Sequence, residues 1–125
     1  MKILNKIHIE SKSAFLPKRS DLEKSVYFFI YKIEINNLNN YPIRLLTRHW
    51  DIKDANGNIN IVDGEGVVGE KPTIDSKKLY TYTSFCPLKT NFGSMKGYYT
   101  FAKKNGEIVK TLIPEFSLIV PNYIN

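Results

Sequence analysis

The strongest constraint on the fold is a two-residue hydrophobic period that recurs in nearly every segment of the chain. In the run 26–35, one face carries only apolar and aromatic side chains: Tyr27, Phe29, Tyr31, Ile33 and Ile35. This spacing predicts a strand with that face in the core. The opposite face starts with Val26, Phe28 and Ile30. We expect these three to be covered by the 16–25 segment, a partner or a second copy of the chain.

The same period predicts a series of short strands separated by turn residues. They are expected at 6–15, 26–35, 43–53, 59–62, 79–85, 95–103, 107–113 and 116–120. Two Asn-Gly pairs, at 56–57 and 105–106, mark hairpins, and we expect positive φ at both residues of each pair. The prolines fall at expected strand ends or in loops, where a residue without an N–H is tolerated: Pro17, Pro42, Pro72, Pro87, Pro114 and Pro121.

This pattern predicts an all-β fold, a two-sheet antiparallel β-sandwich. No segment has a helical period, apart from one short turn possible at 18–24. The length of 125 residues suits a single domain covering 1–125.

Composition narrows the class of protein. The lone cysteine, Cys86, excludes an intrachain disulfide, and no signal peptide or membrane-spanning apolar run is visible, so we expect a cytoplasmic protein that does not contact a membrane. The net charge is +6, but only three of the 18 basic residues are arginines and the lysines are scattered. Sequence-specific nucleic-acid binding is therefore not expected.

The run Gly64-Glu-Gly-Val-Val-Gly69 fits the dinucleotide-binding pattern G-x-G-x-x-G. That pattern works where it joins a strand to a helix whose first turn holds a pyrophosphate. Here Pro72 follows and no helix begins. We interpret the glycines as permitting an unusual backbone path in a loop that joins the two sheets. A nest of backbone amides that binds an anion, helped by Lys71 and opposed by Glu65, is the alternative.

Arg48, His49, Trp50 and Asp51 lie on one expected strand. His49 and Asp51 share a face and could contact one metal ion, but zinc needs further ligands that the sequence does not supply. We therefore predict no metal site, a core position for Trp50, hydrogen bonds for His49, and a carboxylate or loop carbonyls as partners of Arg48. Cys86 has no neighbour that would lower its pKa, so we expect a buried structural thiol.

Several longer runs occur in one order and spacing: Leu45-Leu-Thr-Arg-His-Trp50, 64–72, Tyr82-Thr-Ser-Phe-Cys-Pro-Leu88, Gly93-Ser-Met-Lys-Gly-Tyr98 and Ile113-Pro-Glu-Phe-Ser-Leu118. In these runs the chain resembles the ApaG family. The resemblance implies a fibronectin type III-like or immunoglobulin-like sandwich and a bacterial cytoplasmic protein. It also implies an association with cobalt and magnesium resistance and a role in protein interaction. The family has no established catalytic residues to carry over.

Together these observations predict a binding module without a cofactor or catalytic residues, whose partner is another protein. The expected binding loop comprises Gly64, Glu65, Gly66, Gly69 and Lys71. Arg48 and His49 form the expected adjacent surface, and Val26, Phe28 and Ile30 a possible interface. The alternative is a regulator that binds a dinucleoside polyphosphate, with weak anion or nucleotide binding at 64–69. The sequence leaves open whether the chain is a monomer or a homodimer.

Overall fold

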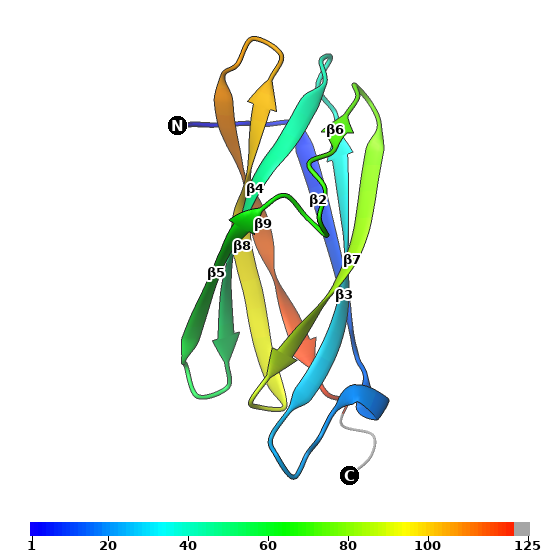
Figure 1. Cartoon of the computed structure of the whole chain (residues 1–125), viewed down its shortest axis with the longest axis vertical. Coiled ribbons are helices and arrows are strands. Elements are labelled where there is room, and N and C mark those ends of the chain that lie inside the picture. Colours follow the sequence, from blue (N-terminus) through cyan, green and yellow to red (C-terminus); the bar gives the residue numbers. More distant parts are fainter. Residues whose placement is uncertain (122–125) are drawn as a thin grey trace.

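The computed structural model describes residues 1–121, in which two β-sheets pack face to face (Figure 1). The strands are β1 (Lys2–Ile3), β2 (Ile7–Phe15), β3 (Tyr27–Asn37), β4 (Ile43–Asp54), β5 (Ile59–Glu65), β6 (Thr73–Ile74), β7 (Leu79–Leu88), β8 (Phe92–Lys103) and β9 (Ile108–Ile119). The helical part of these residues is one 3-10 turn, η1 (Pro17–Arg19). No helix in the described chain is long and apolar enough to cross a membrane. The predicted all-β, two-sheet fold is confirmed.

The larger sheet has the order β1-β9-β8-β4-β5, and β6 also pairs with β4. The smaller sheet has the order β2-β3-β7. All pairs are antiparallel except β1 with β9. On one side of the sandwich β2 and β9 meet, and the Ser13 hydroxyl donates a 2.6 Å hydrogen bond to the Ser117 carbonyl. On the other side lie the sheet edges β5 and β7, and among the described residues no ladder joins them.

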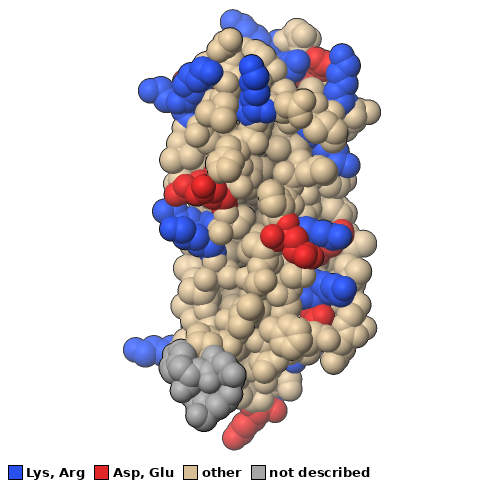
Figure 2. Space-filling model, turned by 180° about the vertical axis from the view of Figure 1, so that it is seen from behind, with Lys and Arg blue, Asp and Glu red and all other residues tan. Residues whose placement is uncertain are grey.

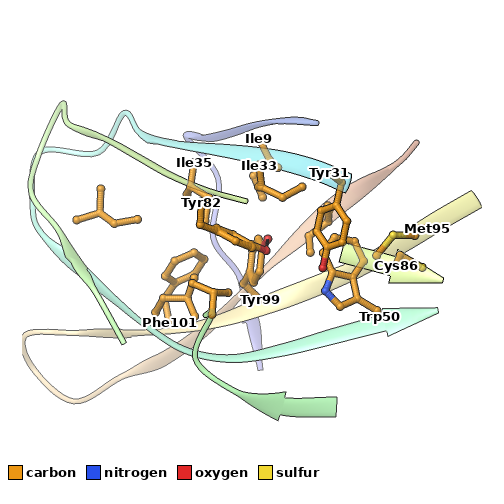
Figure 3. Close-up of a cluster of buried hydrophobic side chains, with 14 of the residues drawn as sticks. Ile9, Tyr31, Ile33, Ile35, Trp50, Tyr82, Cys86, Met95, Tyr99 and Phe101 are labelled. Carbon is orange, nitrogen blue, oxygen red and sulfur yellow. Dashed lines mark hydrogen bonds between the residues drawn. The ribbon is translucent and has the colours of Figure 1, made fainter. Parts of the chain in front are cut away.

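The core lies between the sheets, as the two-residue period predicts. Four of the five aligned residues of β3 are buried, from Phe29 to Ile35. Figure 3 shows Tyr31 and Trp50 in contact across the core, with ring centroids 5.8 Å apart in an edge-to-face arrangement. The hydroxyls of Tyr82 and Tyr99 are hydrogen-bonded to each other, so two buried polar groups from opposite sheets are satisfied.

A buried asparagine holds the connections at one end of the sandwich. The Asn37 amide donates to the carbonyls of Tyr41 and Ile74 at 2.9 and 3.0 Å, and its oxygen accepts from the Asn39 backbone N–H at 3.0 Å. Asn37 is completely buried. These bonds tie β6 to the β3–β4 connection and so set where the chain crosses between the sheets before β7.

Both Asn-Gly hairpins form, but their geometry differs from the prediction. Only Gly57 and Gly106 have positive φ, at 86° and 89°. The Gly106 N–H donates to the Lys103 carbonyl, and the Lys103 N–H to the Glu107 carbonyl. Each turn is therefore a three-residue loop ending in a left-handed glycine, not a two-residue turn. The extra residue shifts the strand register by one position.

Two prolines lie inside strands, contrary to expectation, and the predicted strands 107–113 and 116–120 are a single strand, β9. Pro114 sits where the β8–β9 register shifts between Met95 and Gly97, a bulge. It also lies beyond the two-residue pairing of β9 with β1. Pro87 lies in β7, an edge strand. At both positions one side of the strand has no neighbour to receive an N–H, which explains the tolerance.

Candidate functional site

The outer face of the larger sheet has a shallow hollow of about 350 Å³ where β4, β5 and β8 run side by side. Its lining includes His49 of β4, Asp63 to Glu65 of β5 and Tyr98 of β8. The strand register places His49 opposite both Asp63 and Tyr98. Residues distant in sequence thus form one row across three strands.

The row is held by contacts in which both imidazole nitrogens of His49 have a partner. His49 Nδ1 lies 2.5 Å from a carboxylate oxygen of Asp63, and Nε2 lies 3.0 Å from Asp51. Its ring stacks on Tyr98, with centroids 4.7 Å apart and planes 14° from parallel. The Lys110 ammonium lies 3.9 Å from the centre of the Tyr98 ring. Charges of both signs therefore alternate around one aromatic platform.

The two carboxylates favour the charged form of the imidazole. The hydrogen bond to Asp63 raises the pKa of His49 above its usual value, partial burial opposes this, and Asp51 adds to the increase. A ring whose two nitrogens both bond to carboxylates is poorly placed to accept a proton from a substrate. This arrangement suits an ordered, charged surface and not general-base chemistry.

The glycine segment does not join the sheets, so that prediction is wrong. β5 and β6 pair with the same edge of β4, and residues 66–72 connect them along that edge. The passage to the smaller sheet comes later, between β6 and β7. Within the segment, Val67 and Glu70 exchange backbone hydrogen bonds of 2.8 and 3.0 Å, with Val68 and Gly69 at positive φ. The segment is a tight turn with Val67 buried beneath it.

Arg48 anchors this turn from the core side of β4. Its Nη1 donates to the carbonyls of Glu65 and Gly66 at 3.0 and 2.9 Å, which confirms the prediction of loop carbonyls as partners. A Cβ on Gly64 would lie 2.6 Å from the guanidinium, so the glycine lets the arginine lie flat against the chain. Arg48 and His49 both border the hollow, but as neighbours in a strand they point to opposite faces of the sheet.

The charged side chains of the turn are paired. The Lys71 ammonium lies 2.8 Å from the Glu65 carboxylate, and the Tyr80 hydroxyl donates to Glu70 at 3.2 Å. The backbone amide of Gly66 donates to the Leu46 carbonyl at 2.7 Å. With the Val67 and Glu70 amides also donating to carbonyls, three amides of the supposed phosphate nest are already engaged.

The second predicted surface lies on the outer face of the smaller sheet. Val26, Phe28 and Ile30 are half-buried there. The Arg19 guanidinium, from the η1 turn, lies 4.5 Å above the Phe28 ring and 4.9 Å from that of Phe85. The 16–25 segment therefore covers part of this face. Its use as an interface stays a prediction.

The described residues contain one thiol and no cluster of metal-binding side chains. Cys86 is buried as predicted, and burial raises the pKa of its thiol to about 11, which leaves it protonated at neutral pH. Residues 1–121 contain no group of three or more His, Cys, Asp or Glu side chains that could hold a metal ion.

Basic side chains scattered in the sequence gather in space. Figure 2 shows them concentrated at one end of the face it views. In Figure 1 that end carries the β8–β9 hairpin and the β6–β7 connection. The far end of the sandwich carries the β4–β5 hairpin, so the charge is unevenly distributed along the long axis.

Sequence reasoning found His49 and the glycines but did not assemble the row. It did not pair His49 with Asp63 or place Tyr98 beside it. The signal was in the β4–β5 hairpin: a three-residue loop at 55–57 pairs His49 with Asp63, whereas a two-residue turn would pair it with Gly64. Turn type thus decided which residue faces the histidine.

Comparison with known proteins assigns the family. The sequence-family model of the ApaG domain matches residues 17–103 of this chain. Protein ApaG of Proteus mirabilis is 42% identical over 97% of this chain and 97% of its own length. Protein ApaG of Shewanella piezotolerans is 43% identical over 98% of this chain and 97% of its own. The chain therefore belongs to the ApaG family.

Solved structures agree with the fold. An X-ray structure of a structural-genomics target superposes with a TM-score of 0.90 at 42% identity, covering 95% of this chain and 90% of the other. A crystal structure of a protein from Bordetella pertussis gives a TM-score of 0.89 at 33% identity, covering 97% of this chain and 98% of the other.

Proposed function

We propose that this chain is a non-catalytic module that binds another protein through the hollow on the larger sheet and the adjoining 63–72 segment. The observation that supports this most strongly is the row Asp63–His49–Tyr98, in which the imidazole is bonded to Asp63 and stacked on the Tyr98 ring. Such a surface is ordered before a partner arrives, which lowers the entropic cost of association. It offers no free nucleophile or base.

The surroundings of the row have the composition of an interface. Ile61 and Leu112 lie on the same outer face and are 60% and 59% exposed. They flank the row from β5 and β9. Protein interfaces combine exposed apolar and aromatic groups at the centre with charged groups at the rim, and this face has both.

A dinucleoside polyphosphate is the weaker candidate for the same segment. A pyrophosphate would need free backbone amides or unpaired cations. Three amides of the turn donate to carbonyls, and the Lys71 ammonium faces Glu65. These contacts support a protein partner over a phosphate ligand.

The test is a charge reversal with a matched control. Glu65→Lys should weaken capture of the co-purifying partner at least tenfold while changing the free energy of unfolding by no more than about 1 kcal/mol, because its carboxylate is 70% exposed. Glu23→Lys makes the same charge change in an exposed turn outside the proposed surface and should leave capture unchanged.

A photo-crosslinking amino acid provides a second readout. Placed at Ile61 it should form adducts with the partner, and placed at the exposed Lys32 of the smaller sheet it should not. Crosslinks from Lys32 alone, with Glu65→Lys binding normally, would contradict the proposal and point to the surface of Phe28.

A further inference from the structure

A second cavity, of about 230 Å³, lies between the two sheets on the side where the edges β5 and β7 face each other. Its floor is formed by Trp50 and Tyr31 from opposite sheets, and its rim includes Ser84 of β7. It lies on the core side of β4, whereas the hollow described above lies on the outer side. The volume is below the usual range for drug-sized ligands and suits a small group.

The floor contains a buried donor without an acceptor. Trp50 is 2% exposed, and its Nε1 has no hydrogen-bond partner in the described part of the chain. Figure 3 shows the indole nitrogen turned toward the phenol end of Tyr31, beside Cys86 and Met95. An unsatisfied buried N–H costs free energy and is uncommon in native proteins, so it marks a place where an acceptor is expected.

The other polar side chains around the cavity, those of Arg48, Tyr31, Ser84 and Asn60, can all donate hydrogen bonds. Arg48 borders the cavity. Within residues 1–121 its side-chain hydrogen bonds all come from Nη1, which donates to the two turn carbonyls. Arg48 has no ion-pair partner in that range. Ser84 lies directly opposite Tyr31 in the β3–β7 register, so two hydroxyls face the same space. None of the lining residues is acidic.

Apart from Asn60, the remaining walls are mainly apolar. Ile52 and Val62 come from the larger sheet, and Pro87 comes from β7. A half-buried guanidinium, an indole N–H and two hydroxyls beside aliphatic walls match an acceptor that carries negative charge on a short apolar body. A phosphate, with its greater charge and no apolar part, would leave these walls without contacts.

We propose that this cavity binds a carboxylate group attached to a short aliphatic chain. The carboxylate lies between the Arg48 guanidinium and the Trp50 indole N–H, with Ser84 and Tyr31 as further donors. The aliphatic part contacts Ile52, Val62 and Pro87. The site is independent of the proposed protein interface, because it lies between the sheets and uses different side chains apart from Arg48.

The chain offers a specific probe, since Trp50 is its single tryptophan. The indole N–H gives one side-chain cross-peak in a proton–nitrogen NMR spectrum, and the same ring gives all the tryptophan fluorescence. Isobutyrate, titrated at pH 7 and constant ionic strength, should shift this cross-peak saturably with a millimolar Kd, as expected for a ligand of about six non-hydrogen atoms. Isobutyramide has the same shape without the charge and should bind at least tenfold more weakly.

Matched variants test which side chains contact the bound isobutyrate. Ser84→Ala should weaken isobutyrate binding severalfold, and Thr83→Ala, the neighbouring residue exposed on the other face of β7, should leave it unchanged. Arg48→Gln should weaken binding at least tenfold. If that variant does not fold, Ser84→Ala and the amide isostere still decide the question.

A second titration tests whether the carboxylate belongs to a polypeptide or to a free metabolite. N-acetylglutamate methylamide presents the same group as a side chain of a peptide. Tighter binding of this compound than of isobutyrate would support the proposal and show that the carboxylate comes from a polypeptide. Tighter binding of isobutyrate would also support the proposal and show that the carboxylate belongs to a free metabolite. No saturable indole shift up to about 50 mM of either acid, or equal binding of acid and amide, would overturn it and leave the cavity to water.

Discussion

The β8–β9 hairpin and the 64–70 turn both contain a left-handed glycine, yet the two glycines serve different purposes. At Gly106 an added Cβ would meet nothing within 4 Å. At Gly66 it would lie 2.2 Å from the Glu70 carbonyl oxygen. The first turn is shaped by its own few residues. The second is also held by Arg48 and Leu46, which contact it from β4, and by the adjoining Lys71, which pairs with Glu65.

The difference shows that a glycine can be required by backbone conformation alone or also by the contacts around it. A hairpin turn needs a glycine because of backbone sterics alone. The 64–70 turn also needs the absence of a side chain, because at Gly66 the chain folds back against the Glu70 carbonyl and at Gly64 the Arg48 guanidinium lies against the backbone. Substitutions should therefore be tolerated in the first turn and costly in the second.

Gly66→Ala should have the largest effect. The new Cβ requires both a left-handed alanine and movement of the Glu70 backbone, at a combined cost of about 3 kcal/mol. Urea unfolding of the variant should show a lower midpoint with an unchanged slope. A loss below about 1 kcal/mol would mean that the turn rearranges freely, and the contrast with the hairpin would fail.

Arg48→Gln should come next. It removes the charge and at least one of the two bonds to the Glu65 and Gly66 carbonyls, which we expect to cost about 2 kcal/mol. Arg44→Gln is the matched control, since Arg44 is exposed and makes a single bond to the Lys71 carbonyl at 3.1 Å. Thermal unfolding should separate the two variants. Equal melting temperatures would show that Arg48 does not anchor the turn.

Gly106→Ala should cost about 1 kcal/mol, the strain of one left-handed alanine without a clash. Calorimetry on this variant and on Gly66→Ala under the same conditions gives the comparison directly. Equal losses at the two glycines would show that conformation alone, and not packing, determines the need for glycine in both turns.

The smallest effect should be a pH dependence of the free energy of unfolding, caused by the His49–Asp63 contact on the strand that leads into the 64–70 turn. The Asp63 bond raises the pKa of His49, so its stabilisation is complete below about pH 6.5 and is lost as the pH rises through the folded pKa. Asp63→Asn should therefore be less stable than the parent chain near pH 6, by at most about 1 kcal/mol, and nearly equal to it at pH 8.5.

Denaturant unfolding at the two pH values measures this difference. The comparison is made in a His8→Gln background, so that His49 is the only histidine left. A stability difference that is the same at both pH values would show that the Asp63 contact does not depend on the charge of His49.

Much of the architecture was predictable because alternation acts over a few residues. The face of β3 that carries Phe29 and Ile33 is buried as its period indicates, and Trp50 and Cys86 lie in the core. The candidate site was only partly predictable. His49 was expected to make hydrogen bonds, but its partner Asp63 depends on the register set by the β4–β5 hairpin.

The errors have a common origin in long-range contacts. Pro114 was placed in a loop, yet it is accommodated in β9 because β1 does not reach this point on one side and the pairing with β8 is bulged on the other. The glycine segment was expected to join the sheets, yet both of its ends pair with β4. In each case the outcome depends on how strands distant in sequence pair, which the local residue pattern does not indicate.

The sequence by itself determined the two-residue period, the faces that enter the core and the positions of the hairpins, because backbone sterics and burial operate over a few neighbouring residues. Only the tertiary structure decided the register that joins His49 to Asp63, the anchoring of the 64–70 turn by Arg48, and the cavity where the indole N–H of Trp50 has no acceptor. These features arise where strands or sheets meet, and they depend on distances between segments that the order of residues along one strand does not specify.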